Sequence, residues 1–177
     1  GVVQVVGNPG AFAAAKEDGS VVSWGKAATG CDSSSLADKL PKGIAQVVGH
    51  LNAFAAVKED GSVVSWGDTA TGGGSFSVAD KLQEGVVQVV GNPGAFAAAK
   101  EDGSVVSWGK AASGGDSSSL ADKLQEGVVQ VVGNVGAFAA LKDNGSVVSW
   151  GKAATGGDSS SVANKLQEGV VQVVGNV

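Results

Sequence analysis

The chain contains no arginine, methionine or tyrosine, and it has one cysteine and one histidine in 177 residues. All 12 basic residues are therefore lysines, and the formal net charge at pH 7 is −5. Nucleic-acid binding needs a positive surface and leans on arginine for phosphate and base contacts. The composition therefore argues against nucleic acid as a partner.

The lone cysteine and the lone histidine exclude further kinds of site. Cys31 stands where the other copies of an internal repeat carry glycine, and a single cysteine cannot form an intramolecular disulfide. His50 replaces an asparagine of the same repeat in a turn, and one histidine cannot build a multi-histidine metal site. We interpret both as loop variation, and we expect neither a catalytic residue nor a cofactor.

Long apolar runs are also missing. No uninterrupted stretch approaches the roughly 18 apolar residues that suggest a membrane-spanning helix, and the first residues do not show the charged-then-apolar pattern that indicates secretion. We therefore expect no membrane span. With 43% hydrophobic and 16% charged residues, the chain still has enough apolar material for a continuous core.

An internal repeat dominates the sequence. The motif Gly-Val-Val-Gln-Val-Val-Gly begins at Gly1 and returns, once as Gly-Ile-Ala-Gln-Val-Val-Gly, every 42 residues. Periods of about 20 to 50 residues are typical of solenoids and propellers, in which one unit cannot bury its apolar face alone. We divide the chain into unit 1 (1–42), unit 2 (43–84), unit 3 (85–126), unit 4 (127–168) and a partial fifth unit (169–177), which together form one continuous repeat domain.

Each unit begins with a predicted strand and a β-hairpin. Residues 2–6 are rich in β-branched side chains and bounded by glycines, which favours a strand. Asp18-Gly19 lies between two apolar runs, 11–16 and 20–24, and Asp-Gly is typical of a two-residue hairpin loop. This loop would pair Lys16 with Val21 and Ala13 with Trp24. It would place Ala13, Ala15, Val22 and Trp24 on one face, and Phe12, Ala14 and Val21 on the other.

A short helix is predicted at the end of each unit. In unit 3, Asp116 or a neighbouring serine can supply the N-cap oxygen, and Leu120 and Leu124 lie four residues apart on one helical face. Gly127 can terminate this helix. In unit 2, Gly74 replaces the aspartate, and the segment of unit 1 ends earlier, at Pro41.

Because both faces of the hairpin are apolar, neighbouring units must cover both. We therefore expect the repeated aromatic residues to be structural core, namely Trp24, Trp66, Trp108, Trp150, Phe12, Phe54, Phe96 and Phe138.

The repeat resembles that of the regulator of chromosome condensation family. The resemblance rests on Val-Val-Gln-Val-Val-Gly, Ala-Phe-Ala-Ala-X-Lys and Asp-Gly-Ser-Val-Val-Ser-Trp-Gly, with a Trp-Gly pair at Trp24-Gly25 and its equivalents in all four units. It implies β-propeller-like blades. The exchange-factor activity of that family belongs to particular propeller surfaces, and no residue here matches such a surface.

The fifth copy of the first strand, Val170–Val174, is one strand too many for a closed ring of four blades. We therefore expect a β-rich tandem repeat arranged as an open solenoid-like array, with a closed β-propeller as the alternative.

One repeated group of acidic residues could form a ladder if the turns stack. Oxygen ligands at such an edge suit Ca²⁺, although the spacing is sparser than in known calcium repeats, and the simpler interpretation is that these residues make soluble turns. The ladder comprises Glu17, Asp18, Glu59, Asp60, Glu101, Asp102 and Asp143.

Two classes of function follow. The first is a non-catalytic structural or scaffolding array, as a fragment or subunit of a larger assembly, which nearly uniform loops favour. The second is a protein-binding module that uses the repeat loops as a recognition surface. In both cases we expect a protein partner, or self-association through the terminal repeat edges, where Val170–Val174 lacks the hairpin that follows it elsewhere.

Overall fold

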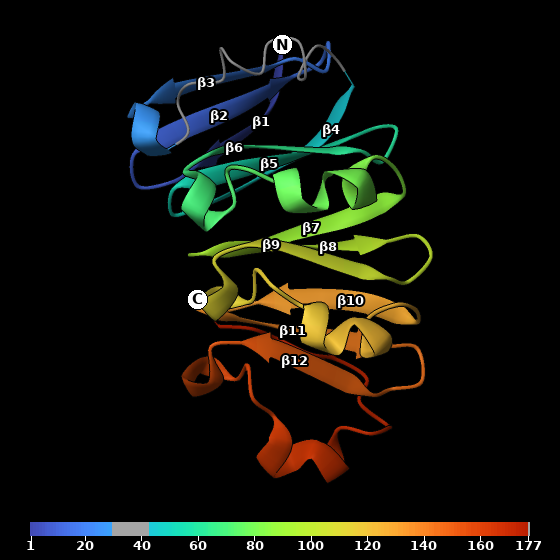
Figure 1. Ribbon diagram of the computed structural model, residues 1–177. Coiled ribbons are helices and arrows are strands. Elements are labelled where there is room, and N and C mark those ends of the chain that lie inside the picture. Colours follow the sequence, from blue (N-terminus) through green and yellow to red (C-terminus); the bar gives the residue numbers. More distant parts are fainter. Residues whose placement is uncertain (30–42, 177) are drawn as a thin grey trace.

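The structure is a computed structural model that describes residues 1–29 and 43–176. Within these ranges it contains four separate three-stranded antiparallel sheets, each made of three strands that are consecutive in the chain (Figure 1). The strands are β1 (Val2–Gly7), β2 (Ala11–Lys16) and β3 (Val21–Gly25); β4 (Ile44–His50), β5 (Ala53–Lys58) and β6 (Val63–Gly67); β7 (Val86–Asn92), β8 (Ala95–Lys100) and β9 (Val105–Gly109); β10 (Val128–Gly133), β11 (Ala137–Lys142) and β12 (Val147–Gly151).

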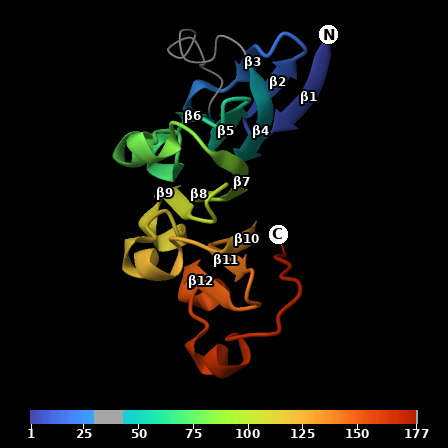
Figure 2. The same cartoon turned by 90° about the vertical axis from the view of Figure 1, so that its right-hand side faces the viewer.

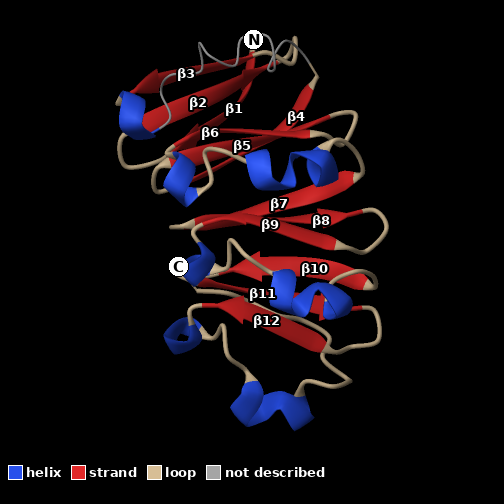
Figure 3. Cartoon of the chain, viewed as in Figure 1, coloured by secondary structure: helices blue, strands red, loops and turns tan. Residues whose placement is uncertain are grey.

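Short 3₁₀ helices follow each sheet (Figure 3). In unit 3, the Ser118 amide at the start of η6 donates to Asp116 Oδ1 at 2.9 Å, while the N-cap residue Ser117 makes no side-chain cap bond, and Leu124 at the C-cap is buried. We expected Gly127 to end this helix, and this expectation is wrong, because η6 already stops at Lys123. Gly127 instead adopts a left-handed conformation just before β10. The helices are η1 (Ala27–Thr29), η3 (Thr69–Thr71), η4 (Phe76–Leu82), η5 (Ala111–Ser113), η6 (Ser118–Lys123), η7 (Ala153–Thr155) and η8 (Ser160–Lys165).

The prediction of β-rich units with a strand, a hairpin and a short helix is therefore confirmed for units 2 to 4. The corresponding helical segment of unit 1, with Cys31 and Pro41, lies outside the described residues. None of the described helices is long and apolar enough to cross a membrane.

The predicted hairpin register is wrong by one residue. Ala15, rather than Lys16, pairs with Val21, and Phe12, rather than Ala13, pairs with Trp24. The loop has three residues instead of two, because the Lys16 amide donates to the Ser20 carbonyl and the Gly19 amide donates to the Lys16 carbonyl. Gly19 takes a φ of +73°, as expected for the bulge position of a three-residue loop.

The corrected register separates two kinds of side chain. Phe12, Ala14, Val22 and Trp24 share one face of the first sheet, and we call this face, with its equivalents in the other units, the aromatic face. The opposite face carries Ala11, Ala13, Ala15 and Val21, and we call it and its equivalents the alanine face. The two aromatic rings of every sheet therefore lie on one side, and the opposite side carries alanines and aliphatic side chains.

The sheets stack one after another, with unit 1 and unit 4 at opposite ends of the column (Figures 1 and 2). The first strands of adjacent units, such as β1 and β4, lie close together. Each core cluster combines the alanine face of one unit with the aromatic face of the next, so both faces of the two interior sheets are covered.

Candidate interaction surfaces

Every junction between units joins an alanine face to an aromatic face. Between units 2 and 3, Ala53, Ala55, Val57 and Val63 pack against Val86, Val89, Phe96, Ala98, Val106 and Trp108, with Leu82 of η4 closing the edge. The alanines allow the two sheets to approach closely, and the rings fill the space between them. Phe96 and Trp108 stack with their centroids 5.3 Å apart. The junction thus has two chemically different halves.

At the junctions of unit 2 with unit 3 and of unit 3 with unit 4, the tryptophan also makes a polar contact, whereas Trp66 Nε1 at the first junction has no hydrogen-bond partner among the described residues. Trp108 Nε1 donates to the Gly72 carbonyl at 3.0 Å, and Trp150 Nε1 donates to the Gly114 carbonyl at 3.0 Å. Both acceptors belong to the preceding unit and follow its short 3₁₀ helix. The indole therefore fixes the register between units as well as filling the core.

The glycine of the Trp-Gly pair is required by close backbone packing. Gly109 has a φ of +112°, and a Cβ atom there would lie 2.8 Å from the Gly94 carbonyl oxygen. No other residue fits without moving the loop between β7 and β8. The motif on which the family resemblance rests therefore has a structural cause in this chain.

A glutamine on the first strand joins adjacent sheets. Gln4 Nε2 donates to the Val47 carbonyl at 3.0 Å, and Gln4 Oε1 accepts from the Val47 amide at 2.9 Å. Gln88 Oε1 lies 3.4 Å from the amide of Val131, the equivalent residue one unit further on. The side-chain amide satisfies a backbone N–H and C=O that the three-stranded sheet leaves unpaired.

The structure places most, but not all, of the expected aromatic residues in the core. Trp108 is 1% exposed, and Phe54, Phe96, Phe138, Trp66 and Trp150 are also buried. The expectation is wrong for Trp24 and Phe12, each of which is 47% exposed. These two residues lie on the aromatic face of the first sheet, and no described unit covers that face.

The loop between the first and second strands is held by an asparagine. Asn92 Nδ2 donates to the Ser113 carbonyl at 2.7 Å, while its Oδ1 accepts from the amides of Gly94 and Ala95. Asn8 and Asn134 make the equivalent bonds in units 1 and 4. The loops proposed as a recognition surface are therefore fixed to the 3₁₀ helix that follows the third strand.

His50 takes the place of this asparagine in unit 2. Its ring is buried and packs on Phe96 of the next unit, with the centroids 4.2 Å apart. Within the described part of the chain, neither ring nitrogen has a well-formed hydrogen bond. Burial lowers the pKa of His50 to about 4, while the Thr71 backbone and the Asp68 carboxylate act in the opposite direction. The imidazole is therefore neutral at pH 7 and belongs to the packing between units.

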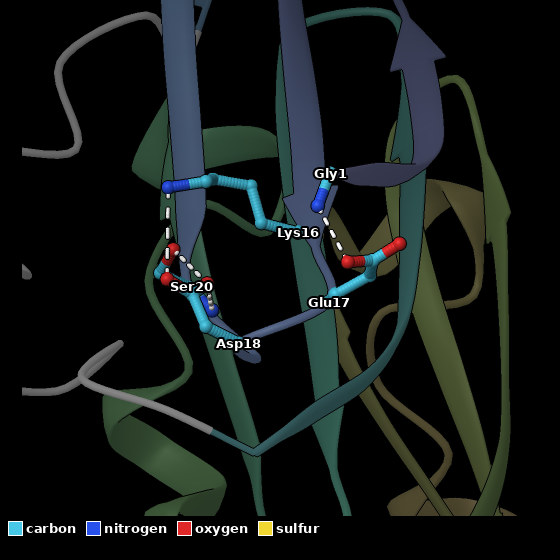
Figure 4. Close-up of polar contacts among 5 residues, drawn as sticks. All are labelled: Gly1, Lys16, Glu17, Asp18 and Ser20. Atoms are coloured by element: carbon cyan, nitrogen blue, oxygen red, sulfur yellow. Dashed lines mark hydrogen bonds and ion pairs between the residues drawn. The ribbon is translucent and has the colours of Figure 1, made fainter.

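The acidic turns are engaged within their own hairpins. Asp18 Oδ1 accepts from the Ser20 amide at 3.0 Å and from the Ser20 hydroxyl at 2.6 Å, and its other oxygen lies 3.6 Å from Lys16 Nζ (Figure 4). The bonds from Ser20 lower the pKa of Asp18 to about 2. Glu17 accepts from the N-terminal amine of Gly1 at 2.6 Å (Figure 4).

The predicted acidic ladder does not form a compact ligand set. Among the described residues, no three histidine, cysteine, aspartate or glutamate side chains come together as they would around a metal ion. A shallow groove between the turns of units 2 and 3 is lined by Glu59, Asp60, Glu101 and Asp102, but also by Lys58 and Lys100. Asp60 and Asp102 accept from the serine two residues further on, as Asp18 does.

No family model matches the chain, and no curated protein matches it. Solved structures do resemble it. Human WBSCR16 matches with a TM-score of 0.52 and 21% identity, over 85% of this chain and 47% of that one. Prp20p of Saccharomyces cerevisiae matches with a TM-score of 0.60 and 18% identity, over 85% of this chain and 44% of that one. The ectodomain of the Arabidopsis thaliana receptor kinase ACR4 matches with a TM-score of 0.59 and 16% identity, over 99% of this chain and 56% of that one.

These likenesses show that the chain has the fold of regulator of chromosome condensation type repeats, with small antiparallel sheets like propeller blades. The chain spans about half the length of the solved proteins it matches. The Prp20p structure is described together with the binding of that protein to Gsp1p and histones, and another describes Kap60 bound to yeast RCC1 (Prp20).

Proposed function

We propose that the chain is a non-catalytic scaffold, an open array of stacked units that holds protein contacts at regular intervals. The observation that carries this proposal is the repeated junction, in which an alanine face always meets an aromatic face. Because every junction pairs the same two faces, units can be added without introducing a new kind of contact between sheets. The nearly identical loops then recur at a constant spacing along the array.

The arrangement of the ends supports an open array over a closed propeller. The core clusters link unit 1 to unit 2, unit 2 to unit 3 and unit 3 to unit 4. β1 pairs with β2 of its own sheet, and the copy of its sequence at residues 169–176 lies against unit 4. A ring of four would need unit 4 to cover the aromatic face of unit 1.

Small-angle X-ray scattering of dilute samples tests this shape. Arrays of two, four and six units, built by removing or duplicating whole units, should show a maximum dimension that rises by a constant increment per unit. A compact profile with a central channel for the chain of four units would overturn the open array in favour of the propeller. Circular dichroism spectra of the same samples establish that every array is folded.

The alternative is a binding module that recognises a partner through its loops. The protein partners named for the yeast structures favour it, since those proteins share this fold. Exposed apolar residues in the loops, Leu51 and Val135, would be the points of contact. Capture from an extract of the source organism should then be lost in Leu51→Asp and Val135→Asp, with Val87→Asp as an exposed control on a strand. We expect no nucleic acid among the captured partners, because the chain is acidic and lacks arginine.

Within the scaffold function, we propose that the array meets other chains through its terminal repeats. The exposed aromatic face of unit 1 and the segment 169–176 both lie at ends of the described array. Apolar surfaces of this kind are typical sites of protein association.

A further inference from the structure

The two ends of the array carry the two halves of one junction. On the aromatic face of unit 1, Val5 is 57% exposed, whereas its equivalents Val47 and Val89 are buried at 2% and 3%. Trp24 and Phe12 on the same face are half exposed, although the equivalent residues of units 2 to 4 are buried. The first sheet therefore presents a surface that, in every other unit, is covered by an alanine face.

Unit 4 presents the matching alanine face. Ala137, Ala139, Leu141 and Val147 occupy the positions held in unit 2 by Ala53, Ala55, Val57 and Val63, which cover Phe96 and Trp108. The acceptor for an indole is also in place, since Gly156 adopts a φ of +96°, like Gly72 at +106° and Gly114 at +90°. The carbonyls of Gly72 and Gly114 accept from Trp108 and Trp150, and a Cβ at Gly156 would meet only the Asn134 side chain, at 4.0 Å.

Each internal junction contains one copy of the first strand of a unit. At a contact between the two end faces, this chain has two identical segments that could take that position. Residues 169–176 repeat residues 1–8 without a change. The first segment forms β1 and pairs with β2. The second lies against unit 4, where the Val170 amide donates to the Gly145 carbonyl at 3.0 Å, as the Val86 amide donates to the Gly61 carbonyl at 3.0 Å. Within the described ranges, residues 169–176 belong to no sheet.

We infer that copies of this chain join head to tail: the aromatic face of unit 1 in one copy docks on the alanine face of unit 4 in another, and either identical segment fills the single strand position between them. When residues 169–176 of the first copy fill it, they pair with β2 of the second copy and release its β1. When β1 of the second copy fills it, residues 169–176 of the first copy are released. The inference rests on the open array proposed above, in which no described unit covers the aromatic face of unit 1 or the alanine face of unit 4, although Ala137 and Leu141 on the latter are already buried within the single chain.

The occupant is a second copy of this chain because the two halves are already complementary within it. The three internal junctions show this same pairing of faces, and Trp24 would find in Gly156 the acceptor that Trp108 finds in Gly72. A contact between different faces is heterologous, so joining two copies leaves one free face of each kind. Association therefore continues beyond the dimer instead of stopping there.

Sedimentation velocity of the full chain over a wide concentration range tests this inference. The parent chain should form a concentration-dependent series of species. Trp24→Lys should leave only single chains, and so should Val22→Lys, a second exposed position on the aromatic face, because a lysine would be buried without a partner. Val3→Lys is the matched control: Val3 is exposed on β1, and its equivalents Val87 and Val129 stay exposed in units 3 and 4, whose aromatic faces are covered. It should associate like the parent.

The two identical segments allow a sharper test. Val5→Lys alone and Val173→Lys alone should still associate, because the unchanged segment fills the strand position. The double variant should not associate, because no apolar segment remains. Circular dichroism establishes that each variant is folded.

A parent chain that stays single at every concentration would overturn the inference. If Trp24→Lys associates as strongly as the parent, or if Val3→Lys fails to associate, the copies are in contact through other surfaces. If Val5→Lys alone or Val173→Lys alone fails to associate, the two segments do not share one strand position. The shape of the single chain is measured separately in dilute solution. An elongated single chain that never associates would therefore leave the scaffold proposal standing and reject only this inference.

Discussion

Trp24 and Trp108 occupy the same position in their units, but their surroundings differ. Trp108 is 1% exposed, stacks on Phe96 and donates to Gly72, whereas Trp24 is half exposed. We predict that Trp108→Ala lowers the free energy of unfolding by about 3–5 kcal/mol, as other large-to-small core substitutions do. Trp24→Ala should cost clearly less. Urea denaturation of the unassociated chain, followed by circular dichroism, measures both values, and equal losses would contradict the assigned burial.

His50 makes the stability of the junction between units 2 and 3 depend on pH. Burial lowers its pKa from 6.5 to about 4, so the unfolded chain takes up a proton more readily than the folded chain between these values. The stabilisation is present above pH 6.5 and is lost as the pH falls toward 4, by about 3 kcal/mol at most. Denaturation midpoints measured across this interval test the prediction.

The other units supply the control for this pH effect. His50→Asn restores the residue found at Asn8, Asn92 and Asn134, and its side chain can bond to the backbone as theirs do. The variant should remove most of the pH dependence between pH 6.5 and 4. The serine two residues further on lowers the pKa of Asp18, Asp60 and Asp102 from the ordinary value of 3.8, so the stabilisation linked to these aspartates is lost mainly below this interval. An unchanged pH profile in His50→Asn would mean that another group is responsible.

Among the structural elements, the hairpin depends on a side chain that caps its own turn. Asp102 Oδ1 accepts from the amide and the hydroxyl of Ser104 at 2.9 and 2.6 Å, and Asn144 accepts in the same way from Ser146 in unit 4. Asp102→Ala should therefore destabilise the turn by about 1 kcal/mol, in line with the loss of a hydrogen bond. Asp102→Asn should have little effect. Hydrogen exchange of the Ser104 amide reports on the turn, and similar rates in both variants would argue against the cap.

The sequence was sufficient to predict the elements of each unit but not the register of the hairpin. The period, the β-branched first strand and the Asp-Gly turn indicate three strands, and three strands are found. The alanine-rich strand offers apolar side chains on both faces, so no alternation of polar and apolar residues selects one register. The choice between a two-residue and a three-residue loop then rests on hydrogen bonds of Lys16, Gly19 and Ser20 that the residue types do not specify.

Two features of the candidate surfaces could not be predicted from the amino-acid sequence. Gln4 is the only polar residue of its strand, but nothing in that pattern shows that its amide reaches the backbone of Val47 in the next unit. The exposure of Trp24 and Phe12 follows from their place at the end of the array, while their local sequence matches the buried copies in unit 3. Both features depend on contacts between units, which follow from stacking rather than from the residues of one repeat.

At the scale of the whole molecule, stability should depend on the number of junctions. Among the described units, only the two interior sheets have both faces covered by neighbouring units, and each junction buries an indole, a phenyl ring and several alanines. In such arrays the unfolding free energy is approximately a sum of intrinsic unit terms and nearest-neighbour interface terms. An additional interior unit should therefore stabilise the chain.

Duplication of unit 3, residues 85–126, inserts one unit and one further junction while leaving both end faces unchanged. We predict that the urea midpoint of the unassociated chain rises, because the new unit has both faces covered and its aromatic residues repeat those of Phe96 and Trp108, which are buried. A closed ring of four would respond in the opposite way, since an extra unit disrupts its closure. A lower midpoint after the insertion would therefore contradict the open array. A further rise with a second inserted unit would establish that each junction adds to the free energy of unfolding of the array.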